Sequence, residues 1–217
     1  MLGDRIPASV LSVRIIPRAD RALLRALDAP EGHISLGILT SDCDDVSYAA
    51  LDEATKKAQV RVAYAQSMYA GSGNASTALA GEFIGILSGF DPAAVRSGLD
   101  AAVHYIRGEA SFVSANAEDS VVYFAHCISR TGSYLSEKAD VPEGTAMAYL
   151  IAPPLEATVG LDAALKAADV EMKVYYGPPT ETNFAGGLLT GEQAACRAAC
   201  EAFAQAVCDV AGAPLDY

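Results

Sequence analysis

The pattern of apolar and polar positions predicts short strands that alternate with helices along the whole chain. The predicted strands cover residues 10–16, 36–39, 60–65, 82–87, 121–128, 147–152 and 170–175, and a further strand contains residues 188–189. The predicted helices cover residues 19–27, 45–57, 91–106, 160–168 and 192–210. This interleaving predicts an α/β fold in which each half of the chain is a sheet with helices packed on it.

The second half of the chain repeats the first. Residues 51–60 read LDEATKKAQV and residues 161–170 read LDAALKAADV, which agree at six of ten positions at an offset of 110. In both copies a strand, a long loop, a second apolar run and an Ala-rich helix follow. We therefore predict a tandem duplication with one domain over residues 1–110 and a second over residues 111–217.

The composition is that of a well-packed globular chain. Apolar residues make up 52% and charged residues 19%, and 42 alanines with no Trp leave much of the packing to small side chains. No segment has the roughly 18 uninterrupted apolar residues of a membrane helix, and the start lacks a signal-peptide pattern. Five cysteines at irregular spacing favour a reducing cytoplasm over a disulfide framework.

The net charge of −12 bears on the partners of the protein. No cluster of Lys and Arg is present to neutralise phosphates, so we expect neither nucleic acid nor an anionic membrane as a partner. A small cationic ligand suits the sign of the charge. An acidic excess that only keeps the protein soluble explains the charge equally well.

No catalytic or metal-binding arrangement stands out, and we predict that the protein is not an enzyme. The histidines lack the spacing of a metal site, and His126 and Cys127 are adjacent in a predicted strand, so their side chains point to opposite faces. Cys196, Cys200 and Cys208 on the last helix could bind a metal, although buried apolar packing is the commoner role. A Cys/His- or metal-dependent enzyme that uses His126, Cys127 and the loop 129–134 is a remote alternative.

Two long loops occupy equivalent places in the two copies, at residues 67–77 and 177–187. Neither matches a phosphate-binding pattern, and long loops at repeated positions are typical of a mouth or gate. The acidic run at residues 42–45 and Glu82 stand near the ends of predicted elements, where carboxylates either cap helices or bind an ammonium group. Both roles stay open.

Long stretches of the chain carry a resemblance to a known family. They are residues 35–56 (SLGILTSDCDDVSYAALDEATK), 68–76 (MYAGSGNAS), 126–136 (HCISRTGSYLS), 148–157 (AYLIAPPLEA), 160–171 (GLDAALKAADVE) and 178–191 (PPTETNFAGGLLTG). With them the whole chain resembles the tandem-domain shell proteins of the bacterial microcompartments for ethanolamine utilization. The resemblance implies two circularly permuted shell domains, known as BMC domains. It also implies a pseudohexameric homotrimer that joins other shell proteins in the shell of a cytoplasmic microcompartment.

The resemblance implies roles for particular residues. Lys166 and Lys56 match the lysine of a D-x-x-x-K-A-A pattern at the tile edge, with Lys57 in place of the first Ala. The loops that gate a central pore match Tyr69, Gly71, Ser72, Gly73, Asn74, Thr180, Glu181, Asn183 and Phe184. The residues that bind ethanolamine in a smaller pore within each subunit match Asp45, Glu82, Phe112 and Thr182. No cofactor is required, and cobalamin is an optional ligand of the central pore.

These implications predict a structural shell protein that passes small metabolites such as ethanolamine through a gated pore. The physical chemistry agrees, because a partly buried ammonium group needs carboxylate partners, which Asp45 and Glu82 supply. The alternative is an ethanolamine-sensing module in which occupancy of the site regulates pore opening. Such a shift requires that the ligand bind one state of the pore more tightly than the other.

Overall fold

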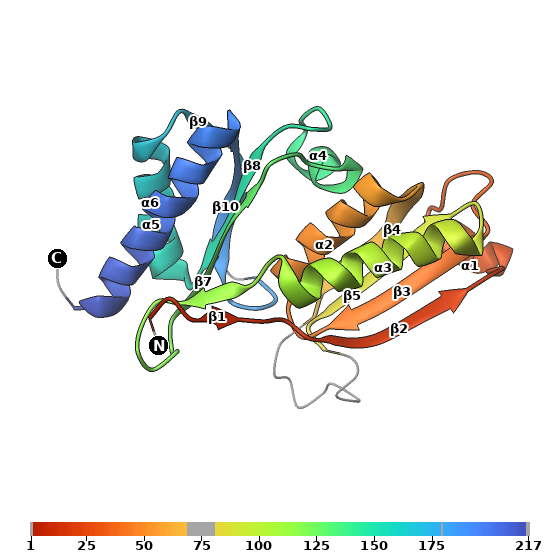
Figure 1. The fold of residues 1–217 in the computed structure, drawn as a ribbon, viewed down its shortest axis with the longest axis horizontal. Helices are drawn as coiled ribbons and strands as arrows, with labels where there is room; N and C mark the ends of the chain where they lie inside the picture. The colour runs from red at the N-terminus through yellow and green to blue at the C-terminus, as the bar shows by residue number, and fades with distance from the viewer. Residues whose placement is uncertain (1, 69–80, 179, 216–217) are drawn as a thin grey trace. The chain divides into compact units, whose positions relative to one another are not determined.

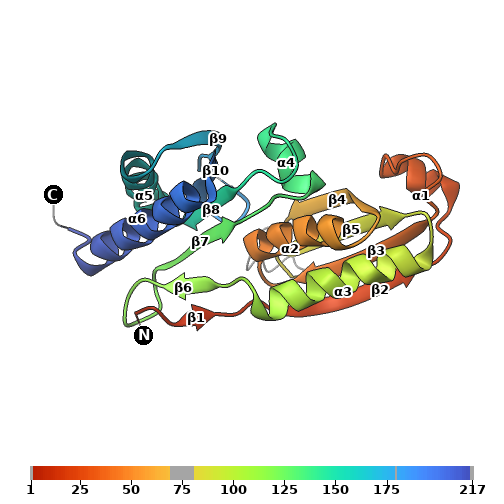
Figure 2. The ribbon, with the colours of Figure 1, turned by 45° about the horizontal axis from the view of Figure 1, so that its top comes forward.

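The computed structural model describes residues 2–68, 81–178 and 180–215, and it confirms the α/β fold (Figures 1 and 2). By contacts the chain forms two compact units. Unit 1 comprises Met1–Ile6, Ser111–Thr131 and Ser136–Tyr217, and unit 2 comprises Pro7–Ala110 and Gly132–Leu135. Each unit is an antiparallel sheet with two long helices packed on it.

Unit 2 contains the first copy of the repeat. Its sheet has the order β2-β3-β5-β4, formed by β2 (Val10–Ile16), β3 (Ser35–Ser41), β4 (Val60–Ser67) and β5 (Phe83–Gly89). The helices are α1 (Arg21–Ala26), α2 (Asp44–Lys57) and α3 (Pro92–Gly108). Helix α3 begins at the predicted place, because the Asp91 carboxylate accepts the N–H of Ala94 and Pro92 occupies the first helical position.

Unit 1 contains the second copy. Its sheet has the order β1-β6-β7-β8-β10-β9, formed by β1 (Arg5–Ile6), β6 (Phe112–Ser114), β7 (Val122–Ile128), β8 (Met147–Ala152), β9 (Val170–Tyr176) and β10 (Ala185–Gly191). Helices α5 (Pro154–Ala167) and α6 (Gln193–Gly212) pack on it. Alanines fill much of this core, and an added Cβ at Gly160 would lie 2.7 Å from the Phe203 ring, so small residues allow the two helices to approach closely.

The duplication appears in the topology, since β7-β8-β10-β9 repeats the order β2-β3-β5-β4. Three short elements were not expected from the hydrophobic pattern: β1, β6 and α4 (Ser133–Ala139). Helix α5 also begins earlier than predicted, at Pro154. Proline suits the first helical position, because its fixed φ is helical and its missing N–H would have no partner there.

Two short segments belong to the unit formed mainly by the other half of the chain: residues 1–6 belong to unit 1, and residues 132–135 belong to unit 2. Strand β1 pairs with β6 in unit 1, and Gly132–Leu135, where α4 begins, lies in unit 2. Among the helices of the described ranges, none is both long and apolar enough to cross a membrane.

Candidate functional site

An acidic group lies where β3 ends and α2 begins in unit 2. Asp42 follows β3, and its carboxylate accepts the N–H of Ser9 at 2.6 Å. Asp44 and Asp45 form the first turn of α2, where negative charge is favoured by the helix dipole. Glu82 comes just before β5, and its backbone N–H donates to the carbonyl of Ser41 at 2.9 Å. Pairing of β3 with β5 therefore brings Glu82 near the carboxylates of residues 42–45, although at least 37 positions separate them in the sequence.

Like charges and burial act on this acidic group. Burial, followed by the charges of Asp44 and Asp42, raises the pKa of Glu82. Burial also raises the pKa of Asp44, although hydrogen bonds, of which the one to Ser67 is the strongest, oppose the rise. The thiol of Cys43 has a pKa well above its ordinary value because it is buried beside Asp45. A cation placed here would relieve the repulsion among the carboxylates.

Tyr48 and Ser67 add hydroxyl groups next to the carboxylates, which the sequence did not single out. Their oxygens lie 2.9 Å apart, and the Tyr48 ring packs edge-on against Phe83 with a centroid separation of 4.9 Å. Burial raises the pKa of Tyr48 to about 12. Tyr48 therefore stays a neutral hydroxyl at neutral pH. Tyr48 follows Asp44 by one helical turn, and this spacing could have predicted from the sequence that the two side chains lie on the same face of α2.

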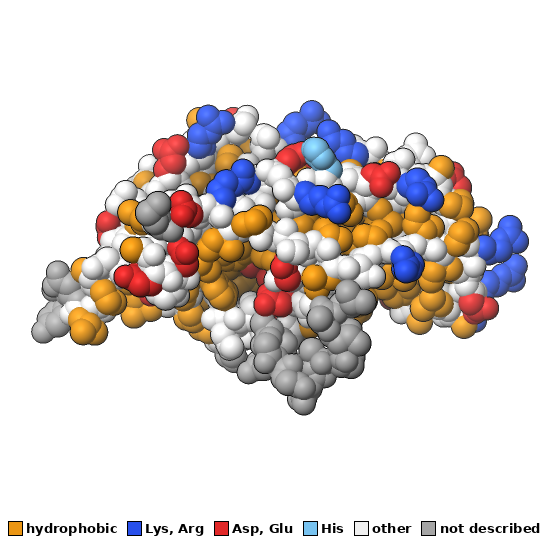
Figure 3. Space-filling view, turned by 60° about the horizontal axis from the view of Figure 1, so that its bottom comes forward, with side chains coloured by type: hydrophobic (Ala, Val, Ile, Leu, Met, Phe, Trp, Pro, Cys, Tyr) orange, Lys and Arg blue, Asp and Glu red, His pale blue; other side chains and the backbone are white. Residues whose placement is uncertain are grey.

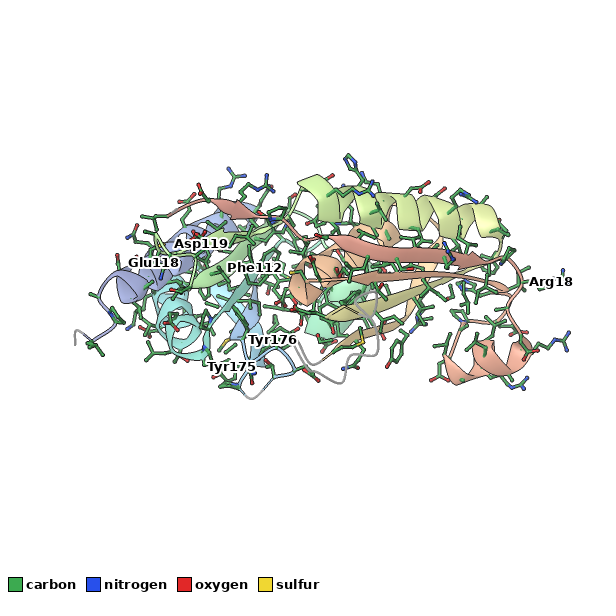
Figure 4. All side chains as sticks on the ribbon, turned by 90° about the horizontal axis from the view of Figure 1, so that it is seen from below. Arg18, Phe112, Glu118, Asp119, Tyr175 and Tyr176 are labelled. Carbon is green, nitrogen blue, oxygen red and sulfur yellow. The ribbon has the colours of Figure 1, made fainter. Side chains whose placement is uncertain are left out.

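In unit 1, Phe112 and Thr182 lie in different surroundings. Phe112 is buried in β6 and stacks on Phe124 with a centroid separation of 5.5 Å, while its other neighbour, Phe184, approaches edge-on at 5.8 Å (Figure 4). Thr182 is half-buried in the turn before β10, and its hydroxyl has no hydrogen-bond partner among the described residues.

Aromatic side chains continue across the sheet from Phe112. Phe124 on β7 contacts His126 at 5.3 Å and Tyr149 on β8 at 5.4 Å, and Tyr149 lies 6.5 Å from Tyr176 on β9, all between ring centroids. The helix-facing side of the same strands carries small residues such as Ala148. The two faces of this sheet thus differ, since the connected ring contacts lie on one face and the other packs Ala148, Leu150 and Leu189 into the core under the helices.

The predicted pore-loop residues divide into two sets. Tyr69, Gly71, Ser72, Gly73 and Asn74 lie outside the described residues. The other set forms a turn in which the Thr180 hydroxyl donates to the carbonyl of Phe184 at 2.7 Å and the N–H of Asn183 donates to the carbonyl of Thr180 at 3.2 Å. Asn183 has a φ of 61°, a conformation that asparagine tolerates, and Glu181 is exposed.

The two predicted tile-edge lysines share an ion pair with the aspartate four residues earlier, and only Lys56 has a second carboxylate partner. The Nζ of Lys56 lies 2.6 Å from Glu53 and 3.5 Å from the buried carboxylate of Asp52. The Nζ of Lys166 lies 2.6 Å from Asp162, and both of these side chains are exposed. The lysines at the same position of the repeat therefore differ in exposure and in the added Glu53 partner, and the pair with the aspartate is kept.

The four cysteines of unit 1 behave as apolar packing. Cys196 and Cys200 belong to the buried core of unit 1, and Cys127 and Cys208 pack against it. Cys127 points to the helix side of β7, whereas His126 stacks on Phe124, so the two lie on opposite faces as predicted. Within the described ranges no three His, Cys, Asp or Glu side chains are placed to hold a metal ion.

Comparison with known proteins places the chain among shell proteins. Residues 35–120 match the family model of the BMC domain. The bacterial microcompartment shell protein EutL of Clostridium perfringens (strain 13 / Type A) is 61% identical over 217 residues, which is 100% of each chain. EutL of Salmonella typhimurium is 50% identical over 98% of this chain and 97% of its own.

Solved structures agree with the sequence comparison. The ethanolamine utilization protein EutL from Leptotrichia buccalis C-1013-b superposes with a TM-score of 0.98 at 64% identity and covers 100% of both chains. EtuB from Clostridium kluyveri shares the fold, with a TM-score of 0.76 at 22% identity over 93% of this chain and 88% of its own.

Fold and similarity together define a bacterial microcompartment shell protein built from tandem, permuted BMC domains. Within that class, the chain belongs to the EutL family. It is a structural component of a microcompartment shell and not an enzyme, as the sequence predicted.

Proposed function

We propose that the chain acts as a homotrimeric pore tile in the shell of an ethanolamine-utilization microcompartment. The repeated strand order of the two units supports this proposal, because three duplicated chains around one axis present six similar edges to neighbouring shell proteins. The fold is also that of the trimeric bacterial microcompartment shell protein PduB, with a TM-score of 0.74 at 21% identity. Sedimentation of the purified protein should give three chains, and a stable monomer would overturn the trimer.

The observation that carries a metabolite-binding role is the acidic group in unit 2. Glu82 has a raised pKa beside Asp44 and Asp42, and Asp45 occupies the first turn of α2, so an ammonium group would gain charge-assisted hydrogen bonds here. In this proposal Asp45 and Glu82 bind the ammonium group of ethanolamine. The contacts of Thr182 with the hydroxyl of ethanolamine and of Phe112 with its methylenes stay predictions from the resemblance. The gating role of the loops and the binding of cobalamin stay predictions from resemblance.

Calorimetry with two ligands tests this assignment. Ethanolamine and ethylamine share the ammonium group, but only ethanolamine has a hydroxyl. We expect Asp45→Asn and Glu82→Gln to weaken binding of both amines at least about tenfold, which corresponds to about 1.4 kcal/mol. Thr182→Val should weaken binding of ethanolamine alone.

The matched control is Asp100→Asn, an exposed carboxylate on α3, which should leave both affinities unchanged. Unchanged ethanolamine binding in Asp45→Asn and Glu82→Gln would place the ligand elsewhere. Equal losses for the two amines in Thr182→Val would remove the hydroxyl contact from the proposal.

A further inference from the structure

The two copies of the repeat can be compared position by position where a helix packs on a sheet. Helices α3 and α6 align at an offset of 101, since their N-cap residues are Asp91 and Glu192. At this offset all the buried residues of α6 coincide with buried residues of α3. Strands β2 and β3 occupy the same places in one sheet as β7 and β8 in the other. The core of unit 2 therefore shows which positions meet in unit 1.

In unit 2, three apolar residues meet where β2, β3 and α3 pack together. Ile15 of β2 pairs with Gly37 of β3, and paired residues of an antiparallel ladder point to the same face of the sheet. A Cβ added at Gly37 would meet the side chains of Val95 and Leu99 of α3, the latter at 2.8 Å. The two helix residues thus pack over one pair of the sheet, whose other member is Ile15.

Three cysteines stand at the corresponding positions of unit 1. Cys127 of β7 pairs with Ala148 of β8, which faces the helices as its counterpart in β3 does. At the offset of 101, Cys196 and Cys200 of α6 align with the two helix residues of the other copy. The duplication therefore brings three thiols to one place in the core of unit 1.

Contacts within unit 1 bring two of these sulfurs close together. The Sγ of Cys127 lies 3.9 Å from the carbonyl oxygen of Gln193, three residues before Cys196 on α6. The Sγ of Cys196 approaches the backbone of Ala148, with which Cys127 pairs. Burial, followed by the charge of Cys127, raises the pKa of Cys196. The sulfur atoms of Cys127 and Cys196 are therefore neighbours.

We propose that Cys127 and Cys196 form a reversible disulfide that ties α6 to β7 when the surroundings become oxidising. Packing alone does not need sulfur here, because the other copy fills the three positions with an isoleucine, a valine and a leucine. Cys200 lies one helical turn farther from the end of α6 that contacts Cys127, so Cys196 is the nearer partner. The inference concerns unit 1 alone and does not rest on the proposed pore tile.

Cys127 is the sulfur that an oxidant meets first. It is partly exposed, whereas Cys196 is fully buried. Apolar side chains, a class that includes cysteine in Figure 3, reach the surface of unit 1 between charged ones. Burial raises the pKa of Cys127, and the positive charge of Arg197 opposes the rise. Arg197 thus stabilises the thiolate form of Cys127, which is the form that reacts.

A small disulfide, such as oxidised glutathione, is the oxidant in this reaction. The Cys127 thiolate attacks one sulfur of the oxidant, which forms a mixed disulfide and releases the first thiol. The Cys196 thiolate then attacks the Cys127 sulfur, which forms the protein disulfide and releases the second thiol. The two protein thiols lose two electrons and two protons in total, and the two released thiols carry them away.

Oxidised glutathione and mass spectrometry test the bond in the full chain. The reduced protein is incubated with oxidised glutathione, its remaining thiols are blocked with N-ethylmaleimide, and it is digested without reductant. We expect a peptide pair that joins Cys127 to Cys196 and that dithiothreitol separates, with maleimide on the other three of the five cysteines. Cys43→Ser changes a cysteine of unit 2 and should leave the bond unchanged.

Thermal unfolding gives a second measurement, and the repeat supplies its variants. The bond would close a loop that contains β8, α5, β9 and β10, which restricts the unfolded chain. The oxidised native chain should therefore melt at least about 4 °C above the reduced chain. Cys196→Val introduces the residue that the first copy has at this position, and Cys127→Val keeps an apolar side chain suited to a strand, so both should fold. The difference in melting temperature should vanish in each.

Four results would overturn the bond. They are maleimide on all five cysteines after oxidation, a link from Cys127 to Cys200, a link between two chains, and glutathione that stays on Cys127. In each case Cys196 is not the partner of Cys127. None of these results bears on the number of chains in the particle or on the acidic group of unit 2, so the proposed function is tested separately.

Discussion

The carboxylate of Asp52 accepts the backbone N–H of Gly132 at 2.7 Å, although 80 positions separate the two residues in the chain. Its second oxygen accepts the N–H of Leu135 at 2.9 Å. Burial raises the pKa of Asp52, and the N–H groups of Gly132 and Leu135 oppose that rise by stabilising the charged form. A side chain of α2 thus performs the capping role at the start of α4 that a residue of α4 itself usually performs.

Loss of this carboxylate should destabilise the fold. Asp52→Ala leaves two buried N–H groups without their acceptor, and we expect the free energy of unfolding to fall by about 2–4 kcal/mol. Urea unfolding followed by circular dichroism measures the change. Asp100→Ala removes an exposed carboxylate from α3 and should change stability by less than about 0.5 kcal/mol. Equal stability of the two variants would contradict the capping role of Asp52.

The close approach of α4 to α2 gives a second prediction. An added Cβ at Gly132 would meet the Thr55 hydroxyl and lie 2.5 Å from the backbone carbonyl of Asp52, which cannot move aside cheaply. We expect Gly132→Ala to lower the free energy of unfolding by about 1–3 kcal/mol. Gly108→Ala at the end of α3, where nothing lies within 4 Å, should be neutral or slightly stabilising in the same assay. A Gly132→Ala variant as stable as the native chain would show that the contact is loose.

The fold was largely predictable because the long helices and strands have a clear apolar periodicity and recur in the sequence at an offset of 110. Helix α4 was not predictable from the pattern, since it has only seven residues and its capping carboxylate comes from α2.

The candidate site was predictable only in part. Carboxylates near the ends of strands indicated where charge would gather, and Asp45 and Glu82 do belong to one acidic group in unit 2. The aromatic contacts of Phe112 could not be foreseen, because Phe124 and Phe184 approach it only through the pairing of β6 with β7 and the turn before β10. Such contacts depend on strand register, which local propensity does not specify.

Phe124 is central to these aromatic contacts and should be costly to remove. It is fully buried, and rings of Phe112, His126 and Tyr149 lie within 5.5 Å of it, centroid to centroid. Phe124→Ala should lower the free energy of unfolding by about 3–5 kcal/mol in urea. Phe90→Ala removes a ring of the same size from an exposed position and should cost far less. Similar losses in the two variants would mean that the rings around Phe124 collapse to fill the space.

Glu82 should make the protein less stable as the pH rises. Its pKa is raised in the folded state from an ordinary value of 4.5, so below pH 4.5 the group is protonated in both states and carries no penalty. As the pH rises through the raised pKa, the unfolded chain releases its proton more readily, and stability is lost. Glu82→Gln stays neutral, so it should melt higher than the native chain at pH 7, by up to about 4 °C. The two should converge near pH 4.

The control for this pH dependence is Glu118→Gln, an exposed carboxyl in unit 1, which should leave the difference in melting temperature near zero at both pH values. Ethanolamine bound to the acidic group should reverse this loss of stability, as the proposed function requires. Because it binds only the folded state, ethanolamine should raise the melting temperature of the native chain at pH 7, but it should have little effect on Glu82→Gln. If Glu82→Gln melts lower than the native chain at pH 7 without ligand, the Glu82 carboxylate is already stabilised by another group, and the acidic group does not hold the unbalanced charge that would attract a cation.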